Sequence, residues 1–411
     1  MTAHALLSAP APTPVGTLPD SHLPDFLHVI DPFTAGEGAL LAAAVATRSS
    51  HARHRAWILG SSSDLRHARR AGLPDPVGVT FSLGAPMTAL RSIWRLRQAL
   101  PAPPETIIAW SPLSLSLALA AWRSPVAPRA PISFVGIMPV GPAAAGRGFL
   151  ARRRLALALR RATIVPLGDA LQSAWSAAVG VGVTALPTPV APLGISPDSR
   201  RALRDELRIA PDELAVLLLS DPPSHADGRH FTQSIGMARL CDLPVVGMMH
   251  RDVPDWPRAL TFVRTHCHEW DMLRIDGPLS LALHAADLCV WDPADRPGSP
   301  GASAQGPVLA LAAAAAGIPV VAPDSPISRE ILAPVADSCL APGWQERQIA
   351  GRLTALVDPA VRAAIADRLR AHHALRLRAF HERLAETLRI VRGSALSAAA
   401  WRDAIELGNL A

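Results

Sequence analysis

Polar side chains that could contact a ligand follow four apolar runs of this sequence, "FLHVI" (26–30), "TIIAW" (106–110), "LAVLLLS" (214–220) and "IPVVA" (318–322). Carboxylates accept hydrogen bonds from hydroxyl groups, a histidine can carry positive charge near neutral pH, and glycines allow tight turns. In chain order these candidate residues are Gly36, Glu37, Gly38, Trp110, Ser111, His225, His230, Asp324 and Glu330.

Each of these residues also has a purely structural interpretation. Glu330 can orient a ligand hydroxyl or cap the helix that follows it, and Asp324 can form a turn. Trp110 suits a core or a cleft wall as well as a flat contact surface for a ligand, and Ser111 precedes a proline and can begin a helix. The sequence leaves both interpretations open.

One cluster has the residue types of a metal site. The stretch "THCHEW" (265–270) places His266, Cys267, His268 and Glu269 in a row. Adjacent residues on a helix point in different directions and do not converge on one ion. We therefore expect no bound metal, and we expect no cofactor.

A basic helix is a further candidate contact surface. The stretch "LARRRLALALRRA" (150–162) is amphipathic and rich in arginine. This pattern is typical of helices that lie on anionic membranes, and equally of a solvent-exposed helix face. Because no basic run is interleaved with aromatic residues, we expect no nucleic-acid binding.

Alternating strands and helices must position these residues. Helices of about 10–15 residues separate short apolar runs throughout the chain, which predicts βαβ units and parallel sheets. The predicted strands are 26–30, 56–60, 77–81, 106–110, 132–140, 162–168, 183–187, 214–220, 244–250, 271–276, 287–293 and 318–322. Long amphipathic segments at 343–356, 359–391 and 395–407 are predicted to close the chain.

A proline-rich stretch divides this pattern into two domains. "LPTPVAPLGISPDS" (186–199) interrupts the alternation. We expect an α/β fold of two doubly wound, Rossmann-like domains facing a central cleft, where ligands bind in such an architecture. The expected parts are a flexible tail (1–24), a first domain (25–190), a second domain (196–375) and C-terminal helices (376–411) that pack back toward the first domain.

Composition excludes several other classes of protein. The 411 residues are too many for one ordinary core, and they are 49% hydrophobic and 18% charged with a net charge of +6. The four cysteines show no CxxC pair, which suits a reducing compartment. We find no signal-peptide pattern at the start. The charge-free stretch 307–322 is interrupted by Gly317 and Pro319, which favours a buried helix and strand over a membrane span.

From about residue 26 to 391 the chain resembles a GT-B glycosyltransferase of the retaining, family 4-like type. The most specific match is "AQGPVLALAAAAAGIPVVA" (304–322), which is similar to the family signature "EGxxLxxLEAMAxGxPVVA". "HVIDPFTAGEGALLAAAVA" (28–46), "TIIAWSPLSLSLA" (106–118) and "HAADLCVWDP" (284–293) resemble further family segments in the right order. The resemblance implies that the first domain takes the acceptor and the second takes the donor.

The resemblance also implies a donor site that this chain has in degenerate form. The family holds the donor diphosphate with cations and the sugar with carboxylates. Both signature glutamates are replaced here, by Ala304 and Ala312. The arginine and lysine of the loop after the second domain's first strand fall on Asp221 and Asp227, whose charges would repel a diphosphate.

Some family positions are kept. Asp324 and Glu330 follow the last strand and are expected to contact the donor, where His225 and His230 could supply part of the missing charge. The phosphate and acceptor loop is expected to comprise Gly36, Glu37, Gly38, Trp110 and Ser111, and no catalytic residue can be named.

Two functions therefore stay open. The chain is either a glycosyltransferase that moves a sugar from a nucleotide-sugar donor to an acceptor, lipid-linked or glycan, or a non-catalytic GT-B protein that serves as a binding or regulatory partner. We expect a cytoplasmic location, with peripheral contact at the inner face of the membrane if residues 150–162 bind lipid.

Overall fold

The computed structural model describes residues 24–408, except 49–51, 81–90, 92, 95–96, 99, 101–102, 123–131, 143–160, 192, 227, 267–271, 294–305 and 374–375. The predicted N-terminal tail (but for its last residue, Pro24) and nearly all of the basic segment 150–162 lie outside this part of the chain.

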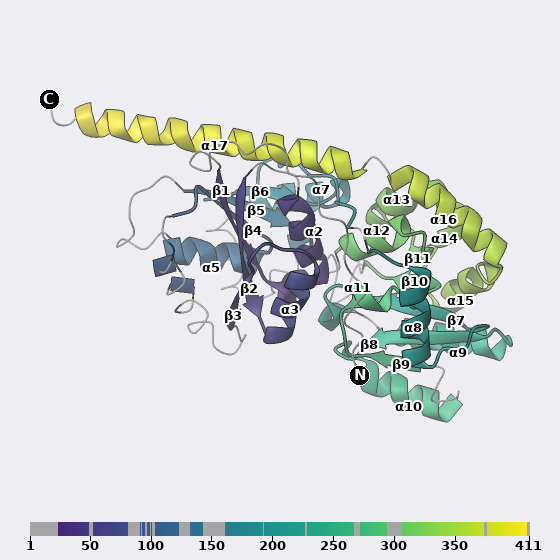
Figure 1. The fold of residues 1–411 in the computed structure, drawn as a ribbon. Helices are drawn as coiled ribbons and strands as arrows, with labels where there is room; N and C mark the ends of the chain where they lie inside the picture. Colours follow the sequence, from purple (N-terminus) through teal and green to yellow (C-terminus); the bar gives the residue numbers. More distant parts are fainter. Residues whose placement is uncertain are drawn as a thin grey trace.

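The first domain is a six-stranded parallel sheet with helices on its faces (Figure 1). Its strand order is β3-β2-β1-β4-β5-β6, and all of its strand pairs are parallel. The strands are β1 (Asp25–Ile30), β2 (Arg53–Gly60), β3 (Val77–Thr80), β4 (Thr106–Ala109), β5 (Ser133–Met138) and β6 (Thr163–Pro166). The helices are α1 (Pro32–Ala35), α2 (Glu37–Thr47), α3 (Ser62–Arg70), α5 (Pro112–Trp122) and α7 (Asp169–Val179).

The second domain repeats this arrangement. Its parallel strands are ordered β12-β11-β10-β7-β8-β9. The strands are β7 (Leu214–Leu219), β8 (Val245–His250), β9 (Met272–Ile275), β10 (Leu288–Trp291), β11 (Val320–Pro323) and β12 (Leu340–Ala341). The helices are α8 (Pro197–Leu207), α9 (Gly228–Leu240), α10 (Trp256–His266), α11 (Leu279–Ala282), α12 (Val308–Ala315), α13 (Pro326–Leu332), α14 (Ala336–Cys339), α15 (Glu346–Ala355) and α16 (Pro359–His373), with short 3-10 turns at Pro223–His225 and Ala333–Val335.

Two alanine-rich helices bring the domains together. Helix α12 packs against α2, and both helices are buried along most of their length. Ala312 lies in α12 and is 1% exposed. Small side chains allow close contact between the two helices, and the position of Ala312, for which the resemblance implies a glutamate, is buried.

The last helix crosses from the second domain to the first. Helix α17 (Arg376–Gly408) runs along the first domain in Figure 1. The ring Nε2 of His381 lies 3.2 Å from the carbonyl oxygen of Val45, and Arg392 forms an ion pair of 2.7 Å with Glu105. The chain therefore connects the domains a second time.

Two expectations about local structure are wrong. The predicted strand 183–187 is extended backbone with a single bridge between Leu186 and Leu167, because Pro187 and Pro189 prevent a continuing ladder. The predicted helices 359–391 and 395–407 are instead α16 and α17: α16 ends at His373, and α17 continues from Arg376 through the predicted break.

Candidate functional site

The loops after β1 and β7 meet at the carboxyl ends of the two sheets, where the sequence predicts a ligand cleft. Asp221 of the second domain extends its carboxylate to the N-terminus of α2 in the first domain. The backbone N–H of Glu37 donates to Asp221 Oδ1 at 2.6 Å, and that of Gly38 donates to Oδ2 at 2.8 Å. Such N–H groups at a helix N-terminus are the usual place for a bound anion.

The two glycines of this loop make room for the carboxylate. A Cβ atom on Gly36 would lie 1.9 Å from Asp221 Oδ1, and one on Gly38 would lie 2.5 Å from Oδ2. Gly36 also has a φ of 79°, which other residues rarely adopt. The glycines that the sequence singles out for phosphate thus lie against a side chain of the same protein.

The protonation of Asp221 follows from its surroundings. Burial and, after it, the neighbouring Glu37 carboxylate raise the pKa of Asp221 to about 8, while the two backbone hydrogen bonds oppose the shift. Asp221 is therefore mostly a neutral acid at pH 7. Asp221 obstructs an anion mainly because it occupies the N–H groups of Glu37 and Gly38. The charge repulsion that the sequence predicts contributes less.

Glu37 makes the reciprocal contact. Its carboxylate accepts hydrogen bonds from the backbone N–H groups of Leu279 at 2.7 Å and Ser280 at 3.1 Å, at the start of α11 in the second domain. His67 Nε2 lies 2.9 Å from Glu37 Oε1. Burial alone would raise the pKa of Glu37, but His67 and Ser280 hold it below its usual value; Glu37 in turn raises the pKa of His67 against the effect of burial.

Glu330 forms a third contact across the interface. It accepts a hydrogen bond of 3.1 Å from the backbone N–H of Ala170, in the first turn of α7, and a bond of 2.7 Å from Arg376 Nη2. Gly168 precedes α7 with a φ of 92°, and a Cβ atom there would lie 2.9 Å from the Glu330 carboxylate. We call the three contacts made by Asp221, Glu37 and Glu330 the carboxylate clasp.

The other predicted residue of this segment lies near the surface. Asp324 pairs with Arg329, with Arg329 Nε 2.5 Å from Asp324 Oδ1, and the two side chains are 33% and 62% exposed. The structure therefore separates Asp324 from the clasp contact that Glu330 makes.

Trp110 and Ser111 lie in the interior of the first domain. Trp110 is fully buried, and its Nε1 donates to His28 Nδ1 at 3.0 Å. His28 Nε2 must then carry the proton and donate to His54 Nδ1 at 2.9 Å. Burial lowers the pKa of His28 well below its usual value and that of His54 to about 4, so both rings are neutral near pH 7.

Ser111 has a buried neighbour at the end of β1. Its hydroxyl lies 3.4 Å from Asp31 Oδ2, and Asp31 also caps α1 by accepting from the N–H of Phe33 at 3.1 Å. Burial raises the pKa of Asp31 to about 6 despite these hydrogen bonds. Sequence reasoning missed Asp31, His28, His54 and His67, because no local pattern shows which strands and helices lie side by side.

The two histidines near β7 lie in different settings. His225 belongs to the 3-10 turn Pro223–His225. His230 lies on α9, with Nδ1 2.7 Å from Glu346 Oε1 of α15. Asp227 and Ala304 lie outside the described residues.

A cavity of about 470 Å³ adjoins the clasp between the domains. We call it the inner cavity. Its lining includes four carboxylate side chains, Glu37, Asp64, Asp252 and Asp276, and one arginine, Arg251. Arg251 Nε lies 3.5 Å from Asp252 Oδ1, and Arg251 Nη1 lies 3.9 Å from Asp276 Oδ1. The positive charge of Arg251 is therefore already balanced. This lining suits hydroxyl groups better than a diphosphate.

A metal site or a membrane span would leave a recognisable feature in the described part of the chain. No group of three or more His, Cys, Asp and Glu side chains there is arranged to hold a metal ion, and no helix there has the length and apolar character that a bilayer crossing requires.

Comparisons with known proteins identify the architecture. No protein-family model matches the chain, and no curated protein matches it. HepE from Anabaena, solved in complex with UDP and glucose, has a TM-score of 0.65 at 15% identity, covering 89% of this chain and 99% of that chain. The sucrose-phosphate synthase of Thermosynechococcus elongatus has a TM-score of 0.62 at 15% identity, covering 90% and 100%.

A glycosyltransferase from Rickettsia africae ESF-5 has a TM-score of 0.61 at 9% identity, covering 90% of this chain and 99% of that chain. At these identities the likeness shows the fold. The chain has the GT-B fold of two Rossmann-like domains, and the prediction of fold class is confirmed.

Proposed function

We propose that this protein is a glycosyltransferase-like GT-B protein that does not transfer sugar from a nucleotide-sugar donor and acts as a binding or regulatory partner. The observation that carries the proposal is the position of Asp221. Its carboxylate accepts both N–H groups at the start of α2, where a donor phosphate would be expected to bind.

Two further features support this proposal. The inner cavity has more carboxylates than cations in its described lining, so a diphosphate entering it would meet repulsion. Ala312, at a position where the resemblance implies a glutamate, is buried in α12 and offers no polar group.

A second candidate function is an active glycosyltransferase, and one observation favours it. The inner cavity has room for a small ligand, and HepE, which shares the fold, was solved with UDP-glucose. For this function Asp221 must leave α2, so that the N–H groups of Glu37 and Gly38 become free for phosphate.

Nucleotide binding distinguishes the two candidates. We expect UDP, GDP and ADP, and their glucose conjugates, to cause no thermal stabilisation of the wild-type protein at millimolar concentration. The variant Asp221→Ser removes the internal acceptor, and we expect it to gain measurable stabilisation by at least one of these nucleotides. Asp324→Ser is the matched control, because Asp324 pairs with Arg329 near the surface.

Two results would decide against the proposal. One is nucleotide binding by the wild-type protein together with release of free nucleotide from a sugar donor in the presence of an acceptor. The other is equal nucleotide binding by the wild type and Asp221→Ser, which would show that Asp221 does not block the site.

A further inference from the structure

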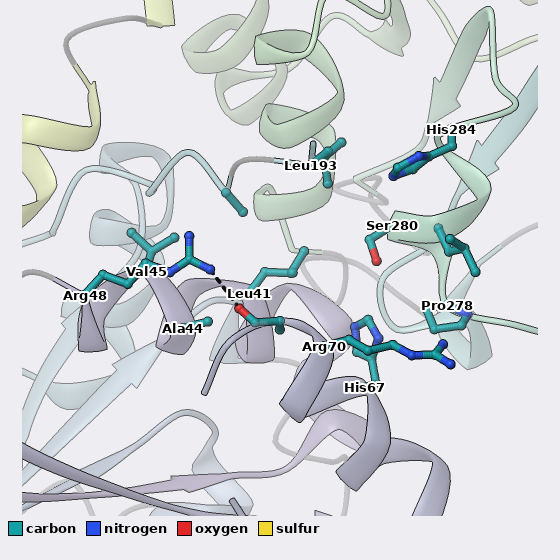
Figure 2. A pocket seen from close by; sticks show the side chains of 13 residues that line it. Leu41, Ala44, Val45, Arg48, His67, Arg70, Leu193, Pro278, Ser280 and His284 are labelled. Carbon is teal, nitrogen blue, oxygen red and sulfur yellow. Dashed lines mark hydrogen bonds between the residues drawn. The ribbon is translucent and has the colours of Figure 1, made fainter. Parts of the chain in front are cut away.

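A second groove lies between the domains. It is next to the inner cavity, since His67, which contacts Glu37, lines both. It has a volume of about 150 Å³, and helices of both domains line it (Figure 2). Leu41 and Val45 come from α2, Leu193 from the segment that connects the domains, and Leu281 from α11. We call it the outer groove.

The outer groove has the opposite charge to the inner cavity. None of its described lining residues is acidic, and Arg48 and Arg70 belong to it. One guanidinium nitrogen of Arg48 donates to the carbonyl oxygen of Ala71, which also lines the groove, at 3.1 Å (dashed line in Figure 2). Arg70 is exposed and forms no salt bridge with another described residue.

The size of the outer groove limits what it can hold. A cavity of about 150 Å³ accommodates one benzene-sized group. Leu281 is a large apolar side chain that is 44% exposed at its edge. The groove therefore has room for a single aliphatic or aromatic side chain, and too little for an extended lipid chain.

We propose that the outer groove docks an acidic segment of a partner protein. One apolar side chain of the partner enters between Leu41, Val45 and Leu193, and flanking carboxylates pair with Arg48 and Arg70. Guanidinium groups bind carboxylates through paired hydrogen bonds, which gives this recognition both strength and direction. The inference rests on the proposed function, since it identifies where a binding partner would contact the protein.

Docking is coupled to the arrangement of the domains. Both domains line the groove, so a segment bound there contacts both and favours the closed arrangement that the carboxylate clasp holds. The structure thus connects partner binding to the clasp through Glu37 and His67, because His67 also lines the groove.

Capped pentapeptides test the proposal on the full chain. The probe has a central phenylalanine with two glutamates on each side, and the comparison peptides have glutamine flanks, lysine flanks or a central glycine. We expect the acidic phenylalanine peptide to bind about tenfold more tightly than the others, as one charge-assisted contact would give. Its binding should shift the methyl NMR signals of Leu41, Leu193 and Leu281.

Charge-reversal variants provide the matched controls. We expect Arg70→Glu to weaken the acidic peptide about tenfold, and Arg48→Gln to weaken it less, since Arg48 also contacts Ala71. Arg258→Glu makes the same charge change on α10, where the side chain is 89% exposed, and should leave binding unchanged. Equal binding of acidic and glutamine-flanked peptides, or full binding by Arg70→Glu, would overturn the proposal.

Two other occupants would also overturn it. If the peptides do not bind, and vesicles of phosphatidylglycerol bind the wild type but not Arg70→Glu, the groove takes lipid. If instead the wild type dimerises and Arg70→Glu is monomeric, the groove takes a second copy. Peptide binding is measured without nucleotide and is therefore independent of sugar transfer. A wild-type protein that binds the acidic peptide and also transfers sugar would refute the proposed function and leave the docking proposal intact.

Discussion

At the residue scale, Asp221 determines what the cleft can bind. A carboxylate at a helix N-terminus satisfies the same N–H groups that a ligand phosphate would use. Its neighbour Glu37 performs the same role for α11 in the opposite direction. Each domain therefore supplies an acidic side chain whose oxygens accept hydrogen bonds from the N-terminus of a helix of the other.

The raised pKa of Asp221 predicts a dependence of stability on pH. Its folded pKa is about 8, whereas an unfolded aspartate titrates near pH ~3.9. Between these values the native state holds a proton that the unfolded state lacks, so the free energy of unfolding falls as pH rises. We expect the free energy of unfolding to fall with pH more steeply in the wild type than in Asp221→Ser. The two slopes should differ by at most about 1.4 kcal/mol per pH unit.

Urea titrations at several pH values between 5 and 8.5 measure this difference. His67 also has a raised pKa and contributes a fall of the same sign in both proteins, so only the difference between them reports Asp221. His28 and His54 act in the opposite direction, since their lowered pKa values cost stability as pH falls below about 6.5. Parallel pH profiles of the wild type and Asp221→Ser would contradict the assignment.

Local sequence could not show these contacts. Glu37 and Asp221 are 184 positions apart, and nothing in either loop indicates that they meet. The sequence did single out Gly36, Gly38 and Glu330, because glycines at strand-to-helix turns and carboxylates after strands are visible patterns. Whether such a residue contacts a ligand or the other domain depends on packing that no local pattern contains.

At the element scale, α2 and α12 were predictable and their contact was not. Both are alanine-rich segments next to buried strands, which is enough to place a helix. Ala312, where the resemblance implies a glutamate, is 1% exposed, so a carboxylate there would be buried among apolar side chains.

The variant Ala312→Glu tests this view of the helix pair. We expect it to destabilise the protein by about 3–5 kcal/mol, because the new charge would be buried without a partner. Ala364→Glu is the control, since Ala364 is exposed on α16, and it should change stability by less than about 0.5 kcal/mol. Denaturant unfolding measures both, and a stable Ala312→Glu protein would show that the interface opens readily.

At the scale of the whole molecule, the domains are joined by the clasp and by two chain connections. Arg376 begins α17 and binds Glu330 at a point where the side chains are 17% and 16% exposed. The ion pair between Arg376 and Glu330 thus holds the start of α17 in place. It also holds the Glu330 carboxylate that accepts from the N–H of Ala170 in the first turn of α7.

The variant Arg376→Gln should loosen the coupling of the domains. We expect a loss of about 2 kcal/mol, the worth of a hydrogen bond between charged groups, and a single calorimetric transition that broadens or divides into two. Arg378→Gln is the control, because Arg378 pairs with Glu382 on an exposed face and is 82% exposed, so its loss should be small. Identical thermograms for the two variants would contradict a coupling role.

The path of α17 has a consequence for how the halves can move. The chain passes from the first domain to the second between β6 and α8, and it returns along α17, which begins at Arg376. When two domains are attached at two separate points, the easiest remaining motion is a hinge rotation of one domain about the line through both points. Twisting or sliding of one half against the other is opposed by the connecting segment together with the packing of α17 on the first domain.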